Sequence, residues 1–153
     1  MLTAKINNTK LFMAHLLKQG TFDGYYLVNA DITTFATFSI NGILNKSYDD
    51  NETNRPYCFW SEAKPYVYEV IKGRRLPKHI KLVLSATPEL VNAVAPKASS
   101  LFINITFDET GVTLITGCSM KEFSLSRKEE YCWDSYIKDM LAENKVSFTE
   151  EEY

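Results

Sequence analysis

The chain has few of the features that identify a membrane-bound or secreted protein. Its 153 residues contain no apolar run near the length needed to cross a bilayer, which is roughly 20 residues. The N-terminus shows no basic flank followed by an apolar stretch, as a secretory signal would. We therefore expect no membrane partner.

Cysteine is also scarce. The chain has three cysteines, Cys58, Cys118 and Cys132, and they are far apart. An odd number of widely spaced cysteines is typical of a reducing compartment and not of a disulfide framework. The sequence therefore predicts a cytoplasmic protein.

Motifs for catalysis, metals and cofactors are missing as well. Cys-x-x-Cys, His-x-x-x-His and His-Glu-x-x-His do not occur, so we expect no metal site. The six glycines are too scattered for a phosphate-binding loop, so we expect no cofactor. Cys118 could be an exposed nucleophile, but no pattern places His15 or His79 beside it, and a structural cysteine is the favoured interpretation. We expect a protein that is not an enzyme.

The residues that are present are typical of a single globular domain spanning residues 1–153. Nine Tyr, nine Phe and a hydrophobic fraction of 45% argue against disorder. The net charge of −2 argues against a protein that coats DNA by bulk electrostatics, but it permits a local basic patch.

Apolar periodicity and helix-end signals predict a strand, a helix, a hairpin, a helix, a strand, a short helix, a hairpin and a final helix. The helices are expected at residues 8–19, 61–72, 87–94 and from 126 onward. The strands are expected near residues 2–6, 26–32, 36–40, 80–85, 101–107, 112–116 and 121–125. This order indicates an α+β fold with two helix-plus-antiparallel-strand units and a C-terminal helix.

Helix ends carry the clearest local signals. Asn8 and Thr87 precede helix patterns, as capping residues do. Ser126-x-x-Glu129 predicts a capping box at the final helix. We expect the acidic residues 150–152 at the end of the chain to fray.

The strand patterns are equally specific. Asn41-Gly42 predicts a type I′ turn, because both residues tolerate positive φ, with Ile40 and Ile43 facing each other across a hairpin. In the preceding strand, alternation places one apolar face on Tyr26, Val28, Ala30 and Ile32.

The strongest concentration of charge lies at residues 71–81, where a helix pattern stops and a strand pattern begins. We call its five cationic residues the basic elbow: Lys72, Arg74, Arg75, Lys78 and Lys81. Arg offers a planar fork of donors and Lys a compact charge, and both suit phosphate oxygens. Two helix residues join the candidate site, Lys64 as a further cation and Tyr68 as a ring that could stack on a base.

The sequence therefore predicts a non-enzymatic binding module whose partner is nucleic acid or an acidic protein. The alternative is a protein–protein interaction or scaffold domain with no nucleic-acid role, which would dock through residues 47–58 or the sheet. In that case the elbow cations only stabilise a helix end and discourage strand aggregation.

Two resemblances extend this interpretation. Residues 26–34, 60–62 and 71–73 and the pair Trp133-Asp134 resemble a small bacterial family of uncharacterised proteins, which implies no function. Two helices, each followed by antiparallel strands, are similar to one domain of the DNA sliding clamps. That resemblance implies that Lys10 and Lys18, with Lys64 and Lys72, face DNA.

Overall fold

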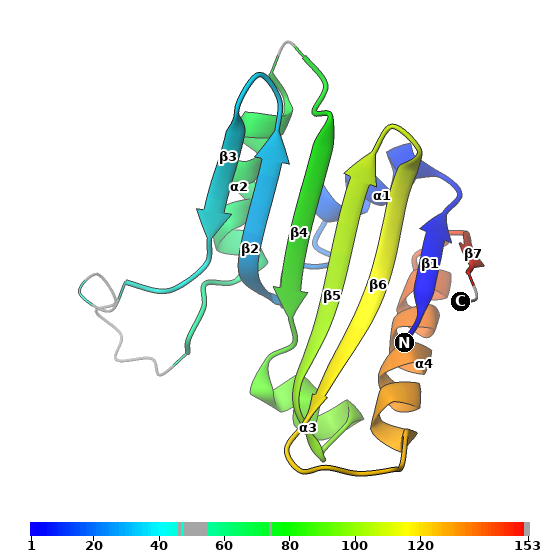
Figure 1. The fold of residues 1–153 in the computed structure, drawn as a ribbon. Coiled ribbons are helices and arrows are strands. Elements are labelled where there is room, and N and C mark those ends of the chain that lie inside the picture. Colours follow the sequence, from blue (N-terminus) through cyan, green and yellow to red (C-terminus); the bar gives the residue numbers. More distant parts are fainter. Residues whose placement is uncertain (46, 48–54, 74, 152–153) are drawn as a thin grey trace.

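The computed structural model describes residues 1–45, 47, 55–73 and 75–151 (Figure 1). Within these residues, seven antiparallel strands form one open sheet in the order β3-β2-β4-β5-β6-β1-β7. The strands are β1 (Thr3–Ile6), β2 (Tyr26–Thr33), β3 (Thr37–Asn41), β4 (His79–Ser85), β5 (Ala98–Asp108), β6 (Gly111–Met120) and β7 (Phe148–Glu150). The helices are α1 (Thr9–Leu17), α2 (Trp60–Ile71), α3 (Pro88–Val94) and α4 (Lys128–Glu143). The predicted α+β class is confirmed, as is the order of the elements apart from the strand expected at residues 121–125, and β7 is added.

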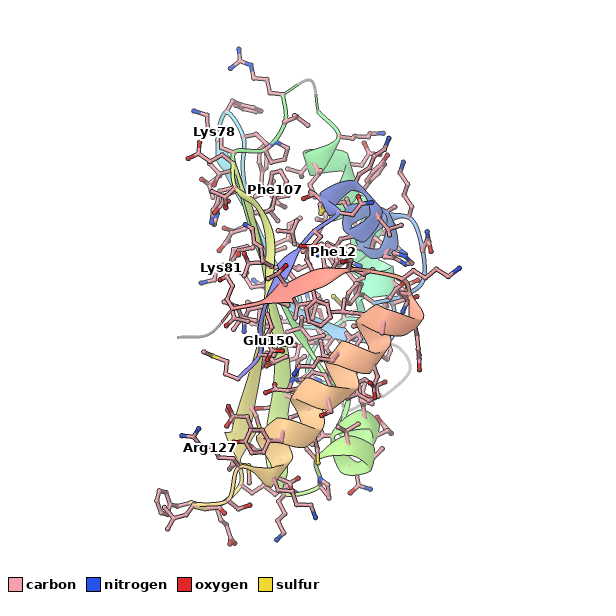
Figure 2. The ribbon with its side chains drawn as sticks, turned by 90° about the vertical axis from the view of Figure 1, so that its right-hand side faces the viewer. Phe12, Lys78, Lys81, Phe107, Arg127 and Glu150 are labelled. Carbon is pink, nitrogen blue, oxygen red and sulfur yellow. The ribbon has the colours of Figure 1, made fainter. Side chains whose placement is uncertain are left out.

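The helices lie on one face of the sheet, and no helix or strand of the described residues covers the opposite face (Figure 2). The core fills the space between the two layers. On β4, the buried side chains Ile80, Leu82 and Leu84 alternate with outward-facing ones, as the sequence predicts. Trp60 of α2 and Trp133 of α4 are completely buried. Burying rings of this size supplies much of the hydrophobic stabilisation of such a domain.

The hairpin between β2 and β3 turns at a different place from the one predicted. The Thr34 N–H donates to the Ala36 carbonyl at 2.9 Å, so the chain reverses there. Asn41 is instead the last residue of β3, paired with Asn29. Gly42 is needed for close approach, because a Cβ there would lie 1.8 Å from the Leu27 carbonyl oxygen. The predicted Asn-Gly turn is wrong, since the glycine serves backbone contact and not positive φ.

The predicted alternation along β2 is also wrong in its first half. The pairing of β2 with β4 shifts register between Leu27 and Asn29. This irregularity turns Leu27 into the core together with Ala30 and Ile32, while Val28 is only half-buried. A β-bulge inserts one extra residue and so reverses the facing of the residues before it.

The start of α4 differs from its prediction. The N-cap residue is Arg127, which makes no capping hydrogen bond with its side chain. The Glu129 carboxylate is buried and accepts the Lys97 backbone N–H at 3.1 Å, so it is not part of a capping box. The Glu129 carboxylate, which a capping box would bond to the start of the helix, is instead bonded to a residue distant in the sequence. Residues 121–125 form no strand, since β6 continues to Met120 instead.

The acidic end of the chain is also ordered further than predicted. Glu150 belongs to β7, which pairs with β1 at the sheet edge. The Lys138 ammonium lies 3.1 Å from the Glu150 carboxylate, and the Glu151 N–H donates to the Thr3 carbonyl at 2.8 Å. Main-chain pairing and one ion pair therefore hold Glu150 and Glu151, which composition alone assigns to a frayed tail, and Glu152 lies outside the described residues.

Candidate binding surface at the basic elbow

The basic elbow connects α2 to β4 at one end of the sheet. The Lys72 N–H closes the helix by donating to the Tyr68 carbonyl at 2.9 Å. Pro77 is buried, and the Lys78 N–H donates to the Thr33 carbonyl at 2.8 Å. These contacts fasten the elbow to the β2–β3 hairpin, so residues from two distant segments form one surface.

Lys64 lies apart from this surface. Its ammonium is 2.7 Å from the Asp23 carboxylate and donates to the Gln19 carbonyl at 3.0 Å, and the side chain is only 16% exposed. These bonds attach α2 to the segment that follows α1. Lys64 is therefore a structural cation, with little of its charge presented to a partner.

Lys72 and Tyr68 are close together, as their helical spacing predicts. The Lys72 ammonium lies 5.8 Å from the centre of the Tyr68 ring and 2.9 Å from the Glu69 carboxylate. The hydrogen bond that Lys72 donates to the Glu69 carboxylate raises the pKa of Lys72. Because Glu69 offsets much of its charge, Lys72 contributes less to an anion site than its position suggests.

The remaining elbow cations are exposed. Arg75, Lys78 and Lys81 point into solvent, and none of them forms a salt bridge with a carboxylate of the described residues. Lys78 and Lys81 lie on the open side of the sheet (Figure 2). Arg74 is outside the described residues. Arg75 and Lys78 are therefore exposed in the connection between α2 and β4, and Lys81 lies further along β4.

The surroundings of Lys81 are partly acidic. Asp31 on β2 is its cross-strand neighbour. The pKa of Asp31 is lowered chiefly by the hydrogen bond from Ser39, which is 2.6 Å away, and further by Asn29, Lys81 and His79. A carboxylate that stays ionised beside Lys81 weakens the field at that point, so Arg75 and Lys78 dominate the positive potential.

An apolar cleft adjoins the elbow, and the sequence patterns do not reveal it. It has a volume of about 630 Å³ and is lined by Phe35, Phe38, Val70 and Arg75, among others. The Phe35 ring is 79% exposed and meets the Phe38 ring edge-on, with the ring centres 5.7 Å apart. The missed signal is the turn at residues 34–36, which takes Phe35 out of the strand and onto the tip of the hairpin.

A second hollow of about 410 Å³ lies at the opposite end of the sheet, where β4 leads into α3. Tyr26, Tyr57, Ser85 and Phe102 contribute to its lining. Burial raises the pKa of Tyr26, so this phenol stays protonated near neutral pH. The hollow offers neutral hydroxyl groups and rings, which suit binding better than proton transfer.

The surroundings of Cys118 do not activate its thiol. Burial raises its pKa, and the carboxylates of Glu130, Glu129 and Asp134 raise it further. Of the two histidines, His15 is hydrogen-bonded to Thr21 at 2.8 Å, and His79 begins β4. A catalytic thiol needs a base or a positive field to form the thiolate. At Cys118, burial and the carboxylates outweigh the N-terminal ammonium, which lowers the pKa of the thiol.

The described residues contain neither a metal-ligand cluster nor a membrane-spanning helix. No three His, Cys, Asp or Glu side chains in this part of the chain come together as metal ligands would. Nor does any helix in the described ranges combine the length and apolar character that crossing a membrane requires.

Comparison with known families identifies the chain without assigning it an activity. The family described as "Family of unknown function (DUF5721)" matches residues 15–149, and the chain belongs to this family. The predicted resemblance to an uncharacterised family is thereby confirmed at the level of a family of unknown function. No curated protein and no solved structure matches the chain, so its likeness to a sliding-clamp domain stays a prediction.

Proposed function

We propose that this member of a family of unknown function is a non-enzymatic binding module that contacts nucleic acid or another polyanion through its basic elbow. One observation carries the proposal. Arg75 and Lys78 are both exposed within one short connection, in a chain whose net charge is negative, and no described carboxylate pairs with them. Unpaired cations in one region of a protein with negative net charge create a local positive potential that attracts anions.

The apolar cleft supports the same proposal. Phe35 presents an exposed ring beside Arg75, and ring faces together with cations are the combination on which unpaired bases stack. Arg75 would contact phosphate oxygens through its planar fork, and Lys78 would contribute a point charge. The module would therefore bind the backbone mainly by charge, with little sequence preference.

The test is a fluorescence-anisotropy titration of labelled single- and double-stranded DNA and RNA at about 50 and 200 mM salt. We expect binding that weakens steeply with salt. The variant Arg75→Glu/Lys78→Glu should unfold at the wild-type urea concentration and bind at least about tenfold more weakly. The slope of the logarithm of its binding constant against the logarithm of salt concentration should be smaller in magnitude by about two. Absence of binding to all four probes at the lower salt concentration would overturn the proposal.

Lys10→Glu/Lys18→Glu is the matched control. Both side chains are exposed on α1 and its C-cap, on the helical layer, and the net charge changes by the same amount. A clamp-like function would instead put DNA on this helical layer, and it predicts that the control variant loses binding. The elbow proposal predicts that the control variant keeps it. The two variants therefore separate the two surfaces in one experiment.

A second candidate function is an interaction module for an acidic protein, favoured by the apolar character of the cleft. An acidic protein with an apolar anchor would place that anchor against Phe35 and Phe38 and its carboxylates near Arg75. Binding to a protein that needs Phe35, with no binding to any nucleic acid, would favour this candidate. Most of the alternative docking segment, residues 47–58, lies outside the described residues.

A further inference from the structure

The two edges of the sheet are protected to different degrees. β7 has three residues, and its Glu150 is paired with Lys138 of α4. β3 has five residues, Thr37–Asn41, with neither charge nor proline among them. In the described part of the chain it pairs with β2 alone. Natural proteins usually blunt an open edge with lysine, proline or a bulge, because an unprotected edge recruits another strand.

The hydrogen-bond pattern of the hairpin shows which groups of β3 are free to pair. The Gly42 N–H donates to the Val28 carbonyl, and the Thr34 N–H donates to the Ala36 carbonyl. In an antiparallel ladder such bonds recur at every second residue. The backbone N–H and C=O groups of Phe38 and Ile40 therefore point toward β2. Those of Thr37, Ser39 and Asn41 point away from β2, toward the open edge of the sheet.

From this arrangement we propose that β3 pairs with β3 of a second copy of the chain around a two-fold axis at Ser39. Thr37 would then face Asn41 of the second copy, and Ser39 would face Ser39. Every outward-facing residue meets another outward-facing residue, so the ladder can form without a shift in either strand. The two sheets would become one continuous antiparallel sheet.

Side chains on the helix-facing side match in the same register. Phe38 and Ile40 lie on this side, because their β2 partners Ile32 and Ala30 are buried. Phe38 would pack against Ile40 of the second copy, an aromatic and β-branched pair that stabilises sheets. Phe35 at the hairpin tip and Ile43 just after β3 lie outside the paired residues, and these side chains, 79% and 66% exposed, would flank the new strand pair.

The charges and the neighbouring helix favour a second copy of the chain as the partner of β3. Because Thr37–Asn41 carries no charge, the two-fold axis brings no like charges together. Tyr66 of α2, 70% exposed, lies one turn before Val70 on the flank that lines the cleft beside β3. It supplies apolar area next to the added strand. A short strand pair with these contacts should give a dimer that dissociates in the micromolar range.

The test is sedimentation velocity of the full chain at about 2–200 µM, a range that brackets such a dissociation constant. We expect a concentration-dependent dimer. Ser39→Lys should make the chain monomeric, because it places two ammonium groups across the axis while leaving each beside Asp31 of its own chain. Ser39→Pro should do the same by removing an outward N–H that β2 does not use.

Ser119→Lys is the matched control, since it adds the same charge to an exposed position of β6, in the interior of the sheet. We expect it to form the dimer like the wild type. Thermal unfolding followed by circular dichroism checks that both Ser39 variants remain folded. A wild type that stays monomeric at the highest concentration overturns the proposal. A dimer that persists in both folded Ser39 variants overturns it equally.

Discussion

Helix α2 has cationic side chains near both of its ends, and the two groups have different surroundings. Near its start, Arg55 bonds to the Glu62 carboxylate and lies 4.6 Å from the centre of the Phe59 ring, while Lys64 bonds to Asp23. Past its end, Arg75 and Lys78 are exposed without a described carboxylate partner. The first group holds segments of the fold together, and the second is available to a ligand.

The difference shows that the number of cations near a helix does not by itself identify a binding surface. Lys64 and Arg75 have the same formal charge and lie only eleven positions apart in the sequence. They differ in whether the fold places a carboxylate or carbonyl oxygen within hydrogen-bonding distance of the side chain. An ion pair that is partly buried contributes to folding stability, whereas an exposed, unpaired cation contributes mainly to long-range attraction.

The largest effect on stability is expected when the first group is disrupted. Lys64→Ala removes the contacts with Asp23 and Gln19 and should lower the free energy of unfolding by about 1–2 kcal/mol, because both bonds are charge-assisted and the ammonium is mostly covered. Urea unfolding followed by circular dichroism measures the change. Lys18→Ala, an exposed position on the neighbouring segment, serves as the control. An equal loss in both variants would contradict the comparison.

An intermediate effect is expected from the Arg55–Glu62 pair, and it should depend on pH. The hydrogen bond from Arg55, followed by that from the Phe59 N–H, lowers the pKa of Glu62 in the folded state. A lowered pKa stabilises the fold above the unfolded value of about 4.3, and this stabilisation is lost as pH falls through the folded value.

Glu62→Gln tests this sign directly. Its deficit in unfolding free energy relative to the wild type should be largest near neutral pH and should shrink as the pH falls below about 4. Urea unfolding curves of both proteins between neutral and acidic pH give the comparison. A deficit that stays constant over the whole range would show that the charge of Glu62 does not stabilise the fold.

The smallest effect is expected from Lys72, which lies between the two groups. Its ion pair with Glu69 joins neighbouring exposed side chains on the same helix, and such pairs contribute little to folding. Lys72→Ala should therefore unfold at nearly the wild-type urea concentration. A loss as large as that of Lys64→Ala would place Lys72 among the structural cations and would narrow the candidate surface to the residues after it.

Much of the fold could be predicted from local patterns. Asn8 and Thr87 cap their helices as expected, each accepting a backbone N–H three residues later. The buried stripe of α4 includes Trp133, Ile137 and Leu141, which follow the four-residue recurrence seen in the sequence. Caps and periodicity are properties of residues within a few positions of one another, so they can be recognised without the tertiary structure.

The errors have a different origin. Asn41-Gly42 is a strong turn signal, yet the chain turns earlier and uses Gly42 for contact with the Leu27 backbone. Glu129 matches a capping box, yet its carboxylate is bonded to the backbone of Lys97, which is 32 positions away. In both cases a contact between distant segments replaced the local interaction that the sequence pattern predicts. Such a contact is absent from any local window of the sequence.

The candidate surface shows the same division. Residues 71–81 are recognisable as a concentration of positive charge from composition alone, because charge is a property of each side chain. Tertiary structure decided which cations of the candidate surface, Lys64 included, are paired with a carboxylate and which are not. Lys64 meets Asp23 and Gln19, 41 and 45 positions away, and Phe35 joins Arg75 only because the hairpin lies beside the end of α2. The sequence by itself determined the helices, most of the strands and the charges. Only packing determined which cations formed ion pairs within the fold and which remained exposed, since an ion pair requires a cation and a carboxylate within a few ångströms of each other.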